Sequence, residues 1–304
     1  MKGRSRAAGV HRAAETSDTA CEVLGERGRR PRVRVFGAWF DNVTMAEAIS
    51  DIDELTRQKE PAVVVTPNLD HVVRMRRDTE YARFVSRANL VLADGQPIVW
   101  ESYLLGTPLK EKVSGADLFP RLCEHSARAG HRVFFLGGEA GAAEGARVVL
   151  ERRYPGLNVV GTHCPRHGFE WRAEDDRAAV EAVRRGKPDI LFVGLGSPRQ
   201  ERWIARNLEE CGAKVGIGVG IAFSFVCGRV RRAPRGLQRL GLEWAYRLCR
   251  EPRRLWRRYL RDAVAMVPMA LGDLAHARGS TARTGARRLG NRFGGSLRTG
   301  GHEP

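Results

Sequence analysis

The sequence lacks three features that would place it directly in a class. Its six cysteines are scattered and no two are spaced as C-x-x-C, so neither a zinc ribbon nor a disulfide framework is expected. The longest apolar run near the C-terminus, 263–271, contains Pro268 and is far shorter than the ~20 residues of a membrane-spanning helix. The N-terminus is polar and has no apolar signal-peptide core. We therefore expect a reduced, cytoplasmic protein.

Acidic residues are scarce only at the two ends. The 304 residues include 52 Lys or Arg and 35 Asp or Glu, a formal net charge of +17. Residues 1–34 hold 9 basic and 4 acidic residues and 229–304 hold 18 and 5, whereas 35–228 hold 25 and 26. This distribution excludes a histone-like protein, and 42% hydrophobic residues exclude overall disorder. The basic ends favour an anionic partner: nucleic acid, a membrane surface or a phosphorylated substrate.

Between the ends, short apolar runs alternate with stretches of helical period. The runs are 62–66, 90–93, 133–136, 159–161, 190–193 and 215–217. The helices are predicted at 45–57, 78–88, 116–129, 140–153, 174–185 and 198–207. Apolar strands that alternate with helices indicate a parallel sheet covered on both faces. We expect an α/β body with a Rossmann-like sheet sandwich over 32–228, after a disordered basic leader over 1–31.

An Arg-rich helical appendage is predicted over 229–275, followed by a disordered basic tail over 276–304. Two helices are expected in the appendage, 237–249 and 252–267. The second carries an apolar stripe of Leu255, Trp256, Tyr259, Leu260, Ala263 and Val267. Such a stripe either packs on the body or lies in a membrane interface, and the spacing alone favours neither.

Ligands of a parallel α/β sheet bind beyond the carboxyl ends of its strands. Three glycine-bearing turns follow predicted strands and would let a phosphate approach the backbone. Their glycines are Gly137, Gly138, Gly194, Gly196, Gly218 and Gly220. None of these turns reads G-x-x-x-x-G-K-[ST], and none gives G-x-G-x-x-G with a later acid, so a P-loop ATPase and a dinucleotide oxidoreductase are disfavoured. A nucleotide ligand and simple tight connections both stay open.

Asp94 is the candidate general base. It directly follows a buried strand, and Gly95 frees the backbone beside it. A carboxylate in this position can take the proton of a hydroxyl, although a helix N-cap would suit the position equally well. Thr66 and Asn68 follow another strand and could donate hydrogen bonds to a sugar or phosphate. His71 is interpreted as a helix-start residue, because no second metal ligand stands at a matching spacing.

Taken together, these strings resemble the WecG/TagA/CpsF family of bacterial glycosyltransferases (glycosyltransferase family 26). The matching segments are VVVTPNLDHVV, ANLVLADGQPIVW, LLGTPLKEKVSGADL, KPDILFVGLGSPRQERWIA, KVGIGVGIAFSF and RVRRAPRGLQRLGLEWAYRLCREPRRLWRRYL. They occur in this order and cover about 35–261. The last string and GLGSPRQE are long and specific.

The resemblance implies an inverting, metal-independent transfer of a sugar, often of the N-acetylmannosamine type, from a UDP-sugar to a polyprenyl-diphosphate-linked acceptor. The reaction would take place at the cytoplasmic membrane face, by a peripherally associated enzyme without a cofactor. Asp94 corresponds to the proposed general base, and Thr66, Asn68 and Gln200 fall in the active-site pocket. The resemblance also implies that the Arg-rich segment folds over this pocket.

Arginines of that segment would bind the diphosphate, and by spacing Arg247, Arg254 and Arg257 fit best. Three positions depart from the family's usual pattern: Ile221 and Ser224 replace Gly and Asp, and Lys112 stands where Arg is frequent and lacks its bidentate geometry. The departures bear on donor and diphosphate recognition. An anionic membrane surface is an expected partner and a homo-oligomer is left open. Nucleic-acid binding is disfavoured by the neutral body.

Overall fold

The computed structural model describes residues 30–293, without the side chains of Arg235, Arg239, Arg254 and 277–293. Nearly all of the predicted leader and residues 294–304 of the predicted tail therefore lie outside the described residues. Within the described range, no helix is both long and apolar enough to cross a membrane.

A six-stranded sheet forms the centre of the molecule, with strand order β4-β3-β8-β7-β5-β6 and parallel pairing throughout. Its strands are β3 (Ala62–Val65), β4 (Leu90–Val91), β5 (Arg132–Gly137), β6 (Asn158–His163), β7 (Ile190–Gly194) and β8 (Val215–Gly218). All six predicted strands are confirmed, each boundary within two residues. The α/β class and the Rossmann-like sheet are thereby confirmed as well.

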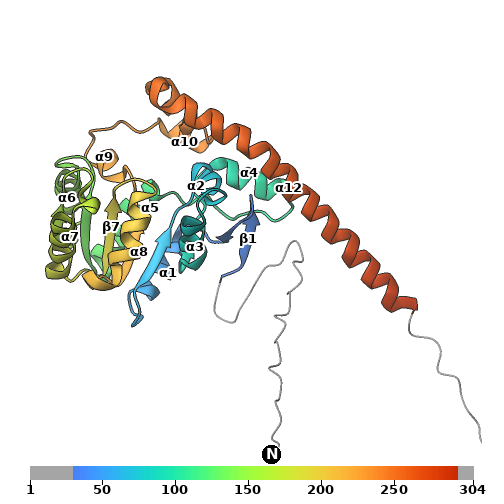
Figure 1. Cartoon of the computed structure of the whole chain (residues 1–304). Coiled ribbons are helices and arrows are strands. Elements are labelled where there is room, and N and C mark those ends of the chain that lie inside the picture. Colours follow the sequence, from blue (N-terminus) through green and yellow to red (C-terminus); the bar gives the residue numbers. More distant parts are fainter. Residues whose placement is uncertain (1–29, 294–304) are drawn as a thin grey trace, which may run out of the picture.

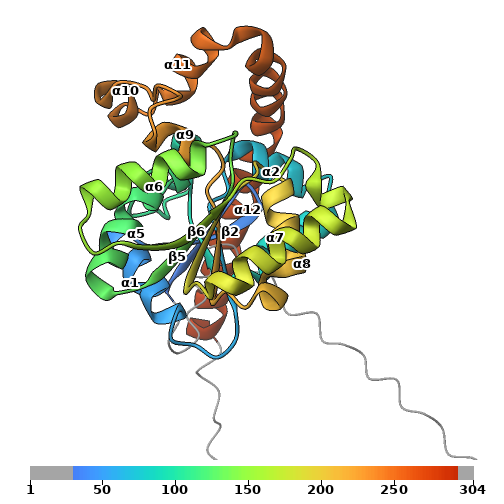
Figure 2. The ribbon, with the colours of Figure 1, turned by 90° about the vertical axis from the view of Figure 1, so that its left-hand side faces the viewer.

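Helices cover both faces of the sheet (Figure 2). On one face lie α1 (Met45–Leu55), α5 (Gly115–Ala129), α6 (Ala142–Arg153) and α9 (Ala222–Val226). On the other lie α7 (Ala173–Gly186), preceded by the short η1 (Phe169–Trp171), and α8 (Arg199–Cys211). Successive strand residues serve opposite cores: Phe135 packs in the first, whereas Phe134 and Leu136 pack in the second. This double burial explains why the strands are apolar throughout.

A two-stranded hairpin, β1 (Arg32–Val35) and β2 (Ala38–Asp41), begins the described chain and was not predicted. Asp41 Oδ2 accepts a hydrogen bond from Val91 N at 2.7 Å, so the hairpin covers the outer strand β4. Around it pack α2 (Leu69–Met75), α3 (Thr79–Arg87) and α4 (Gln96–Leu104), which together form a third core.

The C-terminal segment forms α10 (Arg235–Arg239), α11 (Glu243–Arg250) and the long α12 (Pro252–Phe293), which runs beside α2 (Figure 1). The prediction of one helix over 237–249 was wrong, because Gly241, at φ +72°, breaks it. The predicted end of the second helix at 267 was also wrong. The helix continues through Pro268 and past residue 276, where the predicted tail begins.

Packing on the body holds α12 across this proline. Met269 is buried in the third core, beside the hairpin. Arg261 pairs with Asp70 of α2, and the backbone N–H of Phe36 donates to Asp273. These contacts compensate for the backbone hydrogen bond that a proline cannot donate. The helix is therefore part of the core packing as well as an extension of the appendage.

Candidate active site at the strand ends

The strand order brings the predicted site residues together at the carboxyl ends of four neighbouring strands. Asp94 follows β4, Thr66 follows β3, Gly218 ends β8 and Gly194 ends β7, and these four strands are neighbours. Parallel strands end on the same side, so the four turns lie in a row. Figure 2 shows α10 and α11 beyond this end of the sheet.

Thr66 and Asn68 lie close to the turns that flank them. A Cβ placed on Gly115 would lie 3.1 Å from Thr66 Oγ1, and one on Gly95 would lie 3.8 Å from Asn68 Cβ. Asn68 is the N-cap of α2: its Oδ1 accepts from the His71 N–H, and its own N–H donates to His71 Nδ1 at 3.1 Å. Within the described part, the Asn68 Nδ2 group makes no hydrogen bond and stays available to a ligand. His71 is confirmed as a helix-start residue.

Asp94 is a half-buried carboxylate without a hydrogen-bond donor among the described residues, and its backbone N–H donates to Pro67 O at 3.0 Å. Burial is the largest influence and raises the pKa of Asp94 to about 7. The positive charges of Lys112 and Arg232 lower this pKa, while Glu243 and Asp117 raise it. A carboxyl with a pKa near 7 is matched to general-base catalysis at neutral pH.

Arg232 ties the appendage to the body beside Asp94. Its Nη2 donates to Asp117 Oδ2 of α5 at 3.0 Å and its Nε donates to Glu243 Oε1 of α11 at 3.0 Å. Ser114 Oγ also donates to Asp117 at 2.7 Å. Burial lowers the pKa of Arg232, but its two acid partners outweigh that effect and raise the pKa. The network joins three elements next to the candidate base.

The sequence analysis missed this network. Arg232 stands in the arginine-rich string RVRRAPRG, whose composition does not distinguish it from its neighbours. Its partner Asp117 is 115 residues away in the sequence. Asp117 lies in the first turn of α5, where an acid is ordinarily explained as a helix-start residue.

Gln200 is buried and supports a neighbouring turn. Its Oε1 accepts from the Gly220 N–H at 3.0 Å and its Nε2 donates to Glu201 Oε1 at 3.0 Å. A Cβ on Gly218 would come within 2.5 Å of the Gln200 amide, so this glycine admits the side chain. Both Gln200 groups are thus engaged within the protein, and the residue shapes the turn after β8.

The six predicted glycines divide into two groups. In the first, a Cβ would meet side chains: Phe223 for Gly138 and Gly194, Leu195 for Gly137, and Gln200 for Gly218. Packing accounts for these four without a ligand, and Gly137 and Gly138 also have positive φ angles. In the second group, Gly196 (φ +73°) and Gly220 (φ +54°) have open space where a side chain would stand. These two are the ones that a ligand could approach closely.

The appendage contacts the candidate site through the turn between α10 and α11. Gly241 lies directly against Gln96 of α4, where a Cβ would come within 2.4 Å of Gln96 Cγ. Arg247 is half-buried on α11, and Arg257 is exposed on α12, 5.4 Å above the Trp256 ring. Neither arginine makes an ion pair with a described acid. The backbone of Arg254 lies on α12, but its side chain is outside the described part.

The three departures from the family pattern lie around the same edge. Ser224 is buried in α9 and its carbonyl accepts from Val230 N at 3.1 Å. Ile221 precedes α9 as its N-cap residue. Lys112 lies close enough to Asp94 for its charge to lower the pKa of that carboxyl.

The chain is similar to a family of known proteins. The family model described as "Glycosyl transferase WecG/TagA/CpsF family" matches residues 33–280. Similar relatives come from Staphylococcus aureus strains MRSA252, MW2 and NCTC 8325 / PS 47. Each is named N-acetylglucosaminyldiphosphoundecaprenol N-acetyl-beta-D-mannosaminyltransferase and is 31% identical over 238 residues, which cover 77% of this chain and 91% of the relative.

Proposed function

The chain belongs to the WecG/TagA/CpsF family and is a glycosyltransferase, and from this premise we propose that it transfers an N-acetylmannosamine-type sugar from a UDP-sugar to a polyprenyl-diphosphate-linked acceptor. The names of the Staphylococcus relatives support the sugar and the lipid-linked acceptor. The product would enter a cell-surface polysaccharide, teichoic acid or exopolysaccharide. The observation that carries the proposal is Asp94, a strand-end carboxylate with a pKa near 7 beneath an arginine-rich appendage.

In the proposed reaction, ionised Asp94 takes the proton of the acceptor hydroxyl. The hydroxyl oxygen then attacks the anomeric carbon while UDP leaves from the opposite side, so the configuration inverts. Thr66 Oγ1 and Asn68 Nδ2 lie on the adjoining turns and can hold sugar or phosphate oxygens by hydrogen bonds. Gln200 acts through the turn after β8, which it positions.

Arginines of the appendage are proposed to stabilise the charge that develops on the leaving diphosphate. Arg247 and Arg257 suit this role because neither is neutralised by a described acid, and Arg254 stands one turn before Arg257. A guanidinium offers two parallel donors to phosphate oxygens. Fixed cations can therefore replace a metal ion in this step.

We also propose that α12 contacts an anionic membrane surface. Its exposed apolar residues recur at helical spacing: Trp256, Leu260, Val264, Val267 and Leu271. The exposed side chains of Arg253 and Arg257 accompany this stripe and can pair with lipid headgroups. Of the predicted stripe, Leu255 is buried, whereas Trp256, Leu260 and Val267 are exposed. The remaining exposed stripe favours the membrane interpretation over packing on the body.

A UDP-release assay tests the sugar transfer. UDP-N-acetylmannosamine and a synthetic lipid-diphosphate-linked N-acetylglucosamine should together release UDP, with unchanged rates in EDTA, and NMR of the product should show the inverted anomer. Release that stops in EDTA contradicts metal independence, and a retained anomer contradicts the displacement. If no UDP-N-acetylhexosamine donor reacts, the proposed donor is wrong.

Vesicle sedimentation tests the membrane contact. The chain should sediment with vesicles containing anionic lipid, and Leu260→Glu with Val264→Glu should abolish this. Val148→Glu is the matched control, because Val148 is equally exposed but lies on α6. Equal sedimentation of the double variant and the control contradicts the proposed surface.

A further inference from the structure

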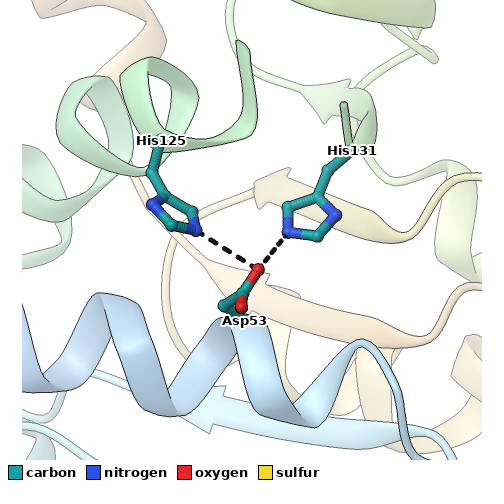
Figure 3. Close-up of side chains that lie close together, drawn as sticks. All are labelled: Asp53, His125 and His131. Atoms are coloured by element: carbon teal, nitrogen blue, oxygen red, sulfur yellow. Dashed lines mark hydrogen bonds and ion pairs between the residues drawn. The ribbon is translucent and has the colours of Figure 1, made fainter. Parts of the chain in front are cut away.

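Away from the strand-end site, Asp53, His125 and His131 converge on one point (Figure 3). Asp53 lies on α1, His125 lies on α5 and His131 directly precedes β5. The cluster is therefore at the amino-terminal ends of the strands, whereas Asp94 lies beyond their carboxyl ends. The Nε2 atoms of His125 and His131 lie 3.2 and 2.7 Å from the same oxygen, Asp53 Oδ1. All three potential ligand atoms lie within 4.8 Å of one another.

The negative charge of Asp53 already has a positively charged partner, so it does not need a protonated His125 or His131 beside it. Arg57, one turn after Asp53, donates to the other carboxylate oxygen, Oδ2, and is itself largely exposed. This contact supplies a cation and turns Oδ1 towards the two rings. The side chains of Asp53, His125 and His131 are 14, 29 and 12% exposed, so an ion and a water molecule can reach them.

We propose that Asp53, His125 and His131 form a site for a divalent transition-metal ion of the zinc class, with water completing the coordination. Two imidazole nitrogens and one carboxylate oxygen suit zinc, cobalt or nickel and are poor ligands for magnesium. Neutral imidazoles bind by moving the ring proton from Nε2 to Nδ1, so the metal takes the place of the two N–H donors.

The distances need only small adjustments to hold such an ion. The two ring centroids are 6.0 Å apart, and a tetrahedral zinc with Zn–N of about 2.0 Å brings two imidazole centroids to roughly 5 Å. The carboxylate oxygen must withdraw by roughly half an ångström from His131 to a ligand–ligand spacing of about 3.3 Å. Rotations of half-buried side chains supply both movements.

A bound ion would join α1, α5 and the start of β5. Because the site lies at the opposite end of the strands from Asp94, we expect a bound ion to change the stability of the fold and not the rate of sugar transfer. An ion that binds only the folded chain shifts unfolding to higher temperature by mass action. The inference is thus independent of the proposed metal-independent reaction.

The test uses the full chain without a histidine tag, stripped with a chelator and titrated with Zn²⁺ by calorimetry. We expect one ion per chain and a higher Tm in Zn²⁺. His125→Gln and His131→Gln should each weaken binding at least about tenfold and remove the rise in Tm. His276→Gln is the matched control, because this exposed imidazole lies on α12 outside the cluster.

Co²⁺ provides a second measurement, since its visible absorption reports ring-nitrogen coordination. Loss of that absorption in the His125→Gln variant, with unchanged circular dichroism, supports the site even if the more buried His131→Gln variant fails to fold. Absence of Zn²⁺ binding by the wild type at about 1 mM, which marks negligible affinity, overturns the proposal. Equal affinity of the His125 and His276 variants overturns it as well.

Discussion

Two carboxylates of the candidate site have opposite environments: Asp94 after β4, and Asp117 at the start of α5, where Arg232 joins the appendage to the body. Burial opposes ionisation of both. For Asp117 the hydrogen bonds from Arg232 and Ser114 outweigh burial and lower the pKa. Asp94 has no such donor among the described residues, and its pKa rises to about 7.

The difference separates the proposed proton acceptor, Asp94, from a carboxylate with a structural role, Asp117. Asp117 stays ionised and holds Arg232, whose second partner, Glu243, belongs to the appendage. Asp94 keeps its oxygens free and can gain or lose a proton near neutral pH. One acid therefore holds the appendage on the body, while the other has no hydrogen-bond donor among the described residues and is the one we propose as the base.

Asp94→Asn should have the largest effect, because it removes the proposed proton acceptor and leaves a side chain of nearly the same size and shape. We expect UDP release to fall about 10²- to 10⁴-fold at pH 8, as measured in the coupled assay. Asp78→Asn is the control: Asp78 caps α3, where Asn caps equally well. Near-normal turnover of Asp94→Asn would show that another group takes the proton.

Arg232→Met should have the next largest effect. It leaves Asp117 and Glu243 without their shared cation, and the resulting repulsion loosens the contact of α11 with the body. We expect transfer to fall about 10- to 100-fold, since small displacements of positioning groups are costly, with faster proteolysis between 229 and 251. Arg184→Met, which also removes an arginine with two acid partners but on α7, should change neither rate.

Asp94→Asn should also change stability, in the opposite direction to activity. The folded chain holds the Asp94 proton more tightly than the unfolded chain, whose carboxyl has the ordinary value of 3.8. The contribution of Asp94 to the free energy of unfolding therefore falls as pH rises from about 4 to 7 and is constant above. Because Asp94 is only partly buried, solvent screens its charge, and we expect Asp94→Asn to be more stable by only about 1–2 kcal/mol at pH 8, in urea titrations. No gain at pH 8 would contradict the raised pKa.

Much of this arrangement could be predicted from the sequence, because it depends on local patterns. Six apolar runs between helical stretches indicate the sheet, and the position of Asp94 after one run indicates the carboxyl edge. The hairpin 32–41 was missed because its strands are only four residues long and, with Arg32 and Arg34 in one and Asp41 at the end of the other, do not form apolar runs. Helices end at glycine or proline by local rules, and tertiary packing overrode such a rule at Pro268.

The parts that could not be predicted join residues far apart in the chain. The Arg232–Asp117 contact and the convergence of Asp53 with His125 and His131 depend on how helices stack across the sheet. Spacing rules detect metal ligands and ion pairs only on one helix or loop. A carboxylate's pKa likewise depends on which distant charges the fold brings near it.

The smallest effect, on the pH dependence of transfer, separates the two carboxylates most directly. With ionised Asp94 as base, kcat/KM of the wild type should fall tenfold per pH unit below about 7. The charge of Lys112 lowers the pKa of Asp94, so Lys112→Gln should move the midpoint upward by up to about one unit. Lys112→Arg keeps the charge and should leave the midpoint in place. Because the midpoint does not depend on the maximal rate, any loss of diphosphate binding in Lys112→Gln leaves the comparison intact. A midpoint that stays fixed in Lys112→Gln would assign the titration to a group other than Asp94.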